Sequence, residues 1–427
     1  MVKNIEKIMK NDYVFSLFQK MINILTGIIT VAIINRYLGV SLKGEYEYIK
    51  NIVNVLNIIF GFGLYASYPY LKRKKESNQL EKYLDLFFSQ AAIYFIICAI
   101  IAIIIKDQII ILSSLLIITQ ILFVQLQNIG VVEFIRYRQV LQIFSYFFEL
   151  ILVLLAYFLI PRNINVLLII LLFKYIICIL AYLIKCSYVP HLFQVPKEFV
   201  HFTFRFGFFA MLTTLLMEFN YSIDVIIMKF FLPYSEIGLY SVGSKLAQYV
   251  WLIPDSFKEV IFSRTAKKDS IEEVKLVLRI NVCITLLMIF MVFIFGKFFI
   301  QFLYGSEYVA AYSVTLVIFL GIPSMVLYKL ISPLYTANGR QLRCFVILSL
   351  SVLFNVVVNF FLIPAYGKMG AACSTVLSYT MCGFILFIDF IKMYNLKWYD
   401  CLILKKDDIQ KLKHKLFPKK VLNKYEK

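Results

Sequence analysis

Polar and ionisable side chains recur at helical spacing inside segments that are otherwise apolar. Ser16, Lys20, Asn23, Gly27 and Thr30 follow one another at steps of 4, 3, 4 and 3 residues, which places them on one face of a helix. Polar side chains are costly inside a membrane and usually face a bundle interior or water. This face therefore predicts contact with a polar cavity or with polar groups of another helix.

Three more segments carry such a polar face. In residues 46–69 the face consists of amides, tyrosines and a glycine with a lysine beside them: Asn51, Asn54, Asn57, Gly61, Tyr65, Tyr68 and Lys50. The other two faces combine hydroxyl, amide and charged side chains: Thr214, Glu218 and Tyr221 with Asn220 and Asp224 adjoining, and Ser241, Lys245, Gln248 and Asp255. Four such helices predict one water-accessible cavity that both halves of the chain line.

The ionisable residues are the candidates for substrate contact: Lys20, Arg36, Lys50, Glu218, Asp224, Lys229 and Lys245. Cations in a cavity suit an anionic substrate, such as a lipid phosphate or pyrophosphate or an acidic sugar. A lysine at the centre of a span costs roughly 2.5–3.5 kcal/mol on insertion scales, so Lys20 needs water or a carboxylate such as Glu218 or Asp224. Two alternatives stay open: hydrogen bonds between helices for the amides, and snorkelling to the headgroups for Arg36 and Lys229.

The composition places these residues in a polytopic helical membrane protein. The chain has 427 residues, of which 61% are hydrophobic and 16% charged, whereas soluble chains average roughly 45–50% apolar and about 25% charged residues. A span needs about 20 residues, and this length predicts all-α structure with about twelve transmembrane helices. The expected spans are 14–35, 46–69, 83–105, 109–132, 141–160, 164–184, 206–231, 238–261, 276–300, 310–335, 343–363 and 370–391.

The positive charge is unevenly divided between alternate loops. The even-numbered loops with the two tails hold 32 Lys and Arg residues, against 8 for the odd-numbered loops. Positive residues stay on the cytoplasmic side, so both termini are expected in the cytoplasm. The net charge of +19 is therefore explained by topology and membrane lipids, and nucleic acid is not expected as a partner.

The sequence also looks duplicated. Phe158-Leu159-Ile160-Pro161 returns as Phe361-Leu362-Ile363-Pro364, each copy with an Arg-Gln pair upstream, and Gly44-Glu45-Tyr46 is echoed by Gly238-Leu239-Tyr240. Since both halves enter the membrane in the same direction, they are predicted to be parallel six-helix repeats. The expected divisions are an N-terminal bundle, a cytoplasmic linker, a C-terminal bundle and a basic cytoplasmic tail: 1–184, 185–205, 206–391 and 392–427.

The sequence lacks the residues that several classes of function require. There is no GxxxxGK[ST] loop for ATP, no constellation of catalytic residues at one membrane face, and no large external loop of the kind that a membrane-bound sugar polymerase needs. The three histidines lie in loops and the eight cysteines form no CxxC pair. We therefore expect no enzyme, no metal site and no cofactor.

Several motifs resemble bacterial polysaccharide-export flippases, within the superfamily of multidrug, oligosaccharidyl-lipid and polysaccharide exporters. They are Asn35-Arg36-Tyr37-Leu38-Gly39 with Gly44-Glu45-Tyr46, Asp224-Val225-Ile226-Ile227, Ile237-Gly238-Leu239-Tyr240-Ser241 with Ile253-Pro254, Leu303-Tyr304-Gly305-Ser306-Glu307-Tyr308, and Ile363-Pro364-Ala365-Tyr366-Gly367 with Gly370-Ala371-Ala372. They cover nearly the whole chain and are more specific for the superfamily than for the substrate.

The resemblance is closest to O-antigen or capsule repeat-unit flippases. It implies a V-shaped bundle with alternating access in the cytoplasmic (inner) membrane. It also implies transport of an undecaprenyl-pyrophosphate-linked oligosaccharide, coupling to an ion gradient, and a polysaccharide polymerase and chain-length regulator as partners. Of the candidate residues, only Arg36 and Asp224 lie in matched motifs. The alternatives are a multidrug or small-molecule antiporter of the same superfamily and a membrane-embedded glycan polymerase.

Overall fold

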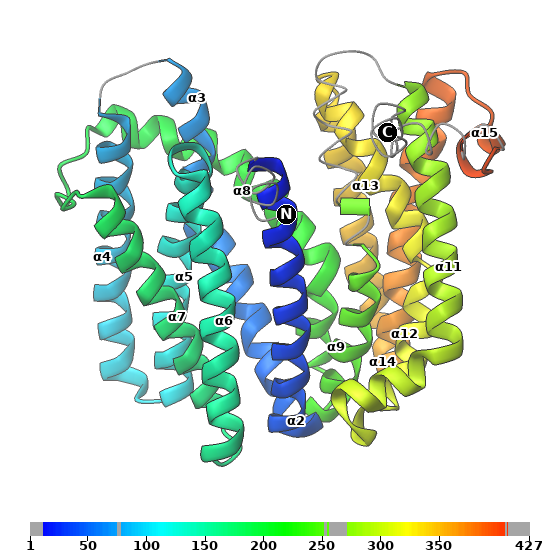
Figure 1. Cartoon of the computed structure of the whole chain (residues 1–427), viewed down its shortest axis with the longest axis horizontal. Helices are drawn as coiled ribbons and strands as arrows, with labels where there is room; N and C mark the ends of the chain where they lie inside the picture. The colour runs from blue at the N-terminus through cyan, green and yellow to red at the C-terminus, as the bar shows by residue number, and fades with distance from the viewer. Residues whose placement is uncertain (1–11, 75–77, 252–253, 256–270, 406–407, 409–427) are drawn as a thin grey trace, which may run out of the picture. The chain divides into compact units, whose positions relative to one another are not determined.

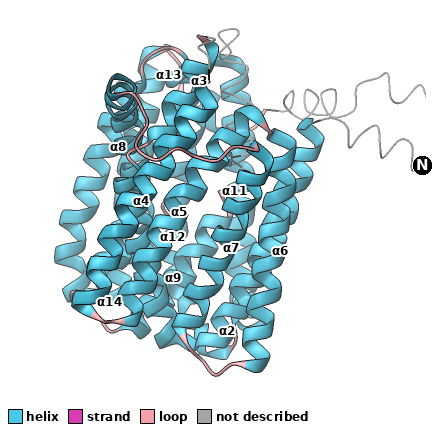
Figure 2. Cartoon of the chain, turned by 90° about the vertical axis from the view of Figure 1, so that its left-hand side faces the viewer, coloured by secondary structure: helices cyan, strands magenta, loops and turns pink. Residues whose placement is uncertain are grey.

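The computed structural model describes residues 12–74, 78–251, 254–255, 271–405 and 408. Within these residues the chain is helical with short loops and no strand, as Figure 2 shows. Two compact units form, one from Met1–Gly238 with Leu303–Glu307 and the other from Leu239–Phe302 with Tyr308–Lys427. The division by contacts thus assigns the seventh expected span to the first unit, whereas the boundary at 185–205 was predicted from duplication and stays a prediction.

The helices follow the expected spans closely. The first unit contains α2 (Asp12–Gly61), η1 (Leu64–Ser67), α3 (Tyr68–Arg73), α4 (Gln79–Ile105), α5 (Gln108–Glu133), α6 (Ile135–Leu159), α7 (Ile164–Cys186) and α8 (Lys197–Met228). The second contains most of α9 (Tyr234–Tyr249) and of α11 (Ile271–Tyr304), then α12 (Ala311–Phe319), α13 (Ile322–Ala337), α14 (Gln341–Met393) and α15 (Trp398–Leu402), with η2 (Ser306–Tyr308) at the boundary.

Two helices are long enough to contain two expected spans each. Helix α2 is interrupted at Gly39, where φ is 70°, and α14 at Gly367, where φ is 57°. In the described residues, eight helices are long and apolar enough to cross a membrane, or nine if the bent pair α12–α13 is one span. With α2 and α14 each counted twice and the shorter α9 included, these helices account for the twelve expected spans. The prediction of an all-α membrane protein is confirmed.

In the first unit α5, α6 and α7 pack against one another and against α2, and α4 packs against α5 (Figure 1). Two apolar clusters hold this packing together. One is centred on aromatic rings of α3, α4 and α7, with Tyr68, Tyr83 and Tyr182 all at least 98% buried. The other joins α2 to α5, α6 and α7 around Tyr46, Leu116 and Leu168. Burial of such rings is the main source of packing energy between these helices.

The connection between α7 and α8 is fastened to α4. The Asp85 carboxylate accepts hydrogen bonds from the Tyr188 hydroxyl at 3.0 Å and the His191 main-chain N–H at 2.6 Å. Burial and this carboxylate raise the pKa of Tyr188 to about 12. Ser89, one turn further along α4, accepts from the Phe193 N–H. One face of α4 therefore anchors this loop.

A network of charged side chains lies inside the first unit. Lys174 on α7 donates to Glu149 on α6 at 2.7 Å, with 11% and 15% of the two side chains exposed. On α2, Lys43 pairs with Glu47 at 2.6 Å. Lys50 lies above the Tyr46 ring and interacts electrostatically with Glu47 and Glu149. Since an isolated charge is costly in a low-dielectric interior, these groups depend on one another.

The second unit holds ion pairs of its own, one of them fully buried. Arg279 on α11 makes two parallel hydrogen bonds to Asp408, at 2.6 and 2.7 Å, and both side chains are buried. Lys329 on α13 donates to Asp255 at 2.8 Å. The Asp408 carboxylate thereby fixes the segment after α15 to α11. The basic tail beyond it lies outside the described residues.

The echoed glycines, Gly44 and Gly238, lie at a close approach inside the first unit. A Cβ on Gly44 would lie 1.7 Å from the Tyr234 carbonyl oxygen, and a Cβ on Gly238 would lie 2.1 Å from the Val40 oxygen. Backbone atoms cannot rotate away as side chains can. The repeated motif therefore marks a backbone-to-backbone contact that admits only glycine.

We predict that Gly44→Ala destabilises the protein, by about 1–3 kcal/mol for overpacking. Gly27→Ala on the same helix is the matched control, since its Cβ would meet only the Tyr146 ring at an ordinary 3.7 Å. An alanine there favours the helix by roughly 0.5–1 kcal/mol. Thermal unfolding of the purified variants compares the two. Equal Tm values would contradict the close contact.

A double-mutant cycle tests the Glu149–Lys174 pair. Glu149→Gln or Lys174→Met alone leaves a buried charge without its partner and is expected to cost about 3–5 kcal/mol. The double variant should lose less than the sum of the two, which Tm measurements reveal. Glu272→Gln is the control, because this side chain is 80% exposed beside Lys275. Additive losses would show that the pair does not interact.

Candidate functional site

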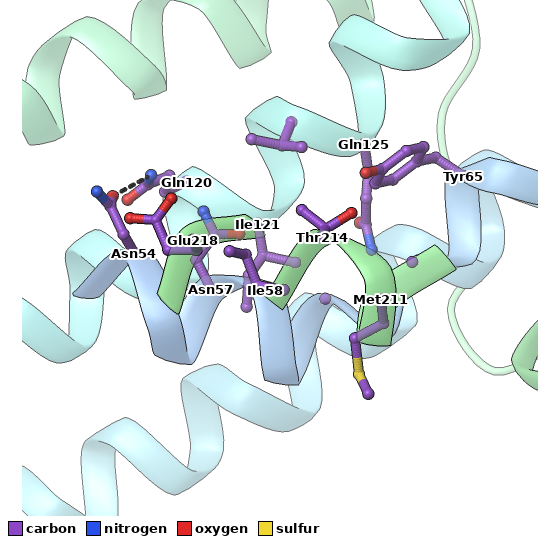
Figure 3. A pocket seen from close by; sticks show the side chains of 13 residues that line it. Asn54, Asn57, Ile58, Tyr65, Gln120, Ile121, Gln125, Met211, Thr214 and Glu218 are labelled. Atoms are coloured by element: carbon purple, nitrogen blue, oxygen red, sulfur yellow. Dashed lines mark hydrogen bonds between the residues drawn. The ribbon is translucent and has the colours of Figure 1, made fainter. Parts of the chain in front are cut away.

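A polar pocket opens within the first unit, where α2, η1, α5 and α8 meet. Its volume is about 290 Å³. The polar lining consists of amides, hydroxyls and one carboxylate: Asn54, Asn57, Tyr65, Gln120, Gln125, Thr214 and Glu218. In Figure 3, Asn54, Gln120 and Glu218 lie toward one end, while Tyr65, Gln125 and Thr214 lie toward the other. Ile58 and Ile121 line the stretch between them.

A second close glycine contact sets the position of α8 at the pocket. A Cβ on Gly207 would lie 2.4 Å from the Phe62 carbonyl oxygen, and one on Gly63 would lie 2.5 Å from the Gly207 oxygen. Gly63 has a φ of 60°, which glycine adopts at no steric cost. Gly207 lies on the same face of α8 as Met211, Thr214 and Glu218, at helical spacing. The crossing therefore turns these three side chains to the pocket.

Hydrogen bonds between amides orient the pocket wall. Gln90 Nε2 donates to the Phe60 main-chain carbonyl at 2.8 Å, and Gln125 Nε2 donates to Gln90 Oε1 at 2.7 Å. At the other end, Gln120 Nε2 donates to Asn54 Oδ1 at 3.1 Å. Gln125 Oε1 is buried and has no hydrogen-bond partner. The pocket is thus built from side chains whose orientation is fixed from behind.

The pocket carries one formal charge. Glu218 is its carboxylate, and no Lys or Arg is among the lining residues. The Ser222 hydroxyl donates to Glu218 Oε1 at 3.3 Å, which leaves most of the carboxylate's accepting capacity unused. The arrangement favours ligands that donate hydrogen bonds. Among the described residues, no group of three or more His, Cys, Asp or Glu could hold a metal ion.

Glu218 is the candidate residue that lines this pocket, and the polar face of the second span contributes Asn54, Asn57, Gly61 and Tyr65. The remaining candidates do not line it. Lys20 lies partly buried on the first part of α2. Arg36 is exposed, and its Nε donates to the Leu303 main-chain carbonyl at 3.0 Å. Lys50 belongs to the charged network around Tyr46.

The candidates from the second half are distributed differently. Asp224 is 1% exposed in α8. The Lys229 ammonium lies 3.6 Å from the centre of the Tyr234 ring. Lys245, in the second unit, is exposed and lies 3.4 Å from Gln248 Oε1. The cavity shared by cationic residues of both halves is therefore a prediction that stays untested, as does pairing of Lys20 with Glu218 or Asp224.

Sequence reasoning missed Gln90, Gln120 and Gln125. All three lie in spans that are mostly apolar, and Gln90 and Gln125 are at least 93% buried. Amides are rarely found buried in such spans without a partner, and this was the available signal. Their pairing across α4 and α5 could not be predicted, because single-helix spacing says which face is polar but not which neighbour it meets.

Comparison with solved structures shows the fold. The inward closed conformation of the lipid II flippase MurJ matches with a TM-score of 0.70 and 17% identity, over 91% of this chain and 88% of that one. An inward-facing multidrug resistance MATE family transporter of the MOP superfamily matches with a TM-score of 0.66 and 10% identity, over 87% and 94%. A MOP superfamily transporter from Pyrococcus furiosus gives 0.60 and 11%, over 90% and 95%.

Comparison with curated protein sequences finds no match. The family model described as "Polysaccharide biosynthesis protein" matches residues 33–313. This range covers about two thirds of the chain, including most of α2 and all of the pocket. With a transporter fold of the MOP type, the chain belongs to the polysaccharide biosynthesis protein family.

Proposed function

We propose that the protein is a flippase that carries an undecaprenyl-pyrophosphate-linked oligosaccharide, an O-antigen or capsule repeat unit, from the inner to the outer leaflet of the cytoplasmic membrane. Transport proceeds by alternating access and draws on an ion gradient. Both termini lie in the cytoplasm, and a polysaccharide polymerase and a chain-length regulator act next to it. The observation that carries this proposal is membership of the polysaccharide biosynthesis family over residues 33–313.

Two features of the chain support a glycolipid substrate. The pocket offers amide and hydroxyl groups next to a carboxylate, a set that suits the hydroxyls of a sugar. Among the cationic residues outside the pocket lining, we assign Lys20 to the pyrophosphate. A lipid-linked glycan requires both kinds of contact. The similar fold of a lipid II flippase is compatible with a substrate that has a lipid tail in the bilayer.

A second candidate function is favoured by one observation. A pocket with a carboxylate and no cationic lining residue also suits a positively charged small molecule. A multidrug or small-molecule antiporter of the same superfamily would use such a pocket. Expression that raises resistance to cationic compounds, without any effect on surface glycan, would support this function instead.

Reconstitution provides the main test. Proteoliposomes with the purified protein are prepared with undecaprenyl-pyrophosphate-linked oligosaccharide that bears a fluorophore on the glycan. A membrane-impermeant quencher then measures the fraction of the glycolipid that is in the outer leaflet. We expect translocation above that of protein-free liposomes, and acceleration by an imposed ion gradient. If the glycolipid crosses the proteoliposome membrane no faster than it crosses protein-free liposomes, while the protein exchanges a cationic dye, the flippase proposal is wrong.

Lys20→Ala tests the role of the cation in the first span. Because the lysine is proposed to contact pyrophosphate, the variant should translocate the glycolipid at least tenfold more slowly, the loss typical of one charge-assisted hydrogen bond. Lys197→Ala is the control, since Lys197 is exposed at the first residue of α8. Both variants must reach the membrane in equal amounts. A Lys20→Ala protein with the full rate would remove this residue from the substrate path.

A further inference from the structure

We propose that the pocket of the first unit binds a sugar ring of the glycan, through hydroxyls that donate hydrogen bonds to Glu218 at one end and Gln125 at the other. This inference rests on the proposed function and narrows it: the pocket selects the sugar and not the pyrophosphate. Asn57, Thr214 and Tyr65 complete the polar surface around the ring.

The orientation of the Gln125 amide follows from the groups that it contacts. A main-chain carbonyl can only accept, so the Phe60 oxygen requires the Nε2 of Gln90. Gln90 must then present its Oε1 to Gln125, which in turn must donate with its Nε2. Gln125 lines the pocket and is 99% buried, and its Oε1 is thereby left buried without a donor among the described residues. A buried acceptor without a partner is rare and costly, and a hydroxyl of a ligand would satisfy it.

The other polar groups point to the same class of ligand. Thr214 gives its hydroxyl hydrogen to the Ala210 carbonyl at 2.8 Å, so its oxygen acts as an acceptor, and it is hydrogen-bonded to the Tyr65 hydroxyl. Glu218 accepts one weak hydrogen bond, from Ser222 at 3.3 Å. Acceptors in excess of donors suit a group rich in O–H. Phosphate oxygens are acceptors and anions, so the Glu218 charge and the absence of a lining cation disfavour them here.

Size and shape separate a sugar from a bare cation. The volume of about 290 Å³ is near the lower limit of small-molecule sites, roughly 300–1,000 Å³, and holds about ten waters at ~30 Å³ each. A monovalent ion needs a far smaller cage. The polar groups lie toward two ends with Ile58 and Ile121 between them (Figure 3). A pyranose has hydroxyls around its rim and C–H groups on its face, which fits this distribution.

The test compares two lipids that differ in the sugar alone. Protein in phospholipid nanodiscs, free of detergents with sugar headgroups, is titrated with undecaprenyl pyrophosphate and with the same lipid bearing N-acetylglucosamine. We expect wild type to bind the sugar-bearing lipid more tightly. Glu218→Gln should lower this preference roughly tenfold or more, as for a hydrogen bond to a charged group, and leave affinity for the sugarless lipid unchanged. Glu198→Gln, exposed on the same helix, should retain the wild-type preference.

Gln90→Met is the second variant and acts without contacting the ligand. It releases Gln125 to rotate, while the Phe60 carbonyl keeps a donor in the Tyr94 hydroxyl at 2.9 Å. The ratio of the two affinities should fall several-fold, although the pocket lining is unaltered. A purely structural role for Gln90 would lower both affinities together and leave their ratio unchanged. Thermal unfolding in the nanodisc identifies any variant that has lost its fold.

Three outcomes would overturn the inference. Equal affinity of the wild-type protein for both lipids would mean that the pocket does not bind the sugar. Loss of affinity for both lipids in Glu218→Gln would assign the pocket to the pyrophosphate or to stability. Stabilisation by NaCl over choline chloride that Glu218→Gln abolishes, without a sugar preference, would assign it to a cation. Each result is separable from the proposed function, because translocation is measured independently. If the wild-type protein translocates the glycolipid but binds both lipids equally well, this inference is wrong and the proposed function stands.

Discussion

The interior of a bilayer offers no water to polar groups, so every backbone amide, hydroxyl and charge in the hydrocarbon must find its partner within the protein. Helices meet this requirement for the backbone. The side chains meet it through contacts between helices, such as Lys174 with Glu149 and Gln125 with Gln90. Elsewhere glycines let backbones approach, as where Gly63 beside η1 meets Gly207 on α8. A polar atom that remains without a partner in such a framework, like Gln125 Oε1, is therefore informative.

The charges of the first unit fall into separate environments. Lysines lie in the network around Tyr46 and Glu149, whereas the pocket has a carboxylate and amides. A lipid-linked oligosaccharide also has two chemically different parts, because its pyrophosphate is an anion and its glycan is rich in hydroxyl groups. The sequence interpretation gave one cavity both roles. In the structure the acceptor-rich pocket is separate from the lysine network around Tyr46. Such a separation would let a flippase distinguish a lipid carrier with an attached glycan from one without it.

The sequence was sufficient for the spans, because long apolar runs and glycine breaks have direct physical consequences. It also identified the polar face that carries Asn54, Asn57 and Tyr65, and it identified Glu218. It could not supply partners. No spacing in the sequence joins Lys174 to Glu149, and none marks Asp85 as the anchor of the loop after α7. Helical spacing defines a face, but tertiary packing decides which other helix that face meets.

The duplicated glycine motifs acquire a physical meaning from this packing. Gly44 and Gly238 occupy equivalent places in the two copies, and each leaves no room for a Cβ against the other's chain. A motif that recurs because two backbones touch constrains both copies at once, whereas a motif that binds substrate is free to diverge. The polar faces differ only in part: at the offset of 194 residues that relates Gly44 to Gly238, Asn54 corresponds to the amide Gln248, whereas Asn57 corresponds to Trp251. The glycine contact is thus shared by both copies, whereas the polar faces keep some side chains in kind and change others.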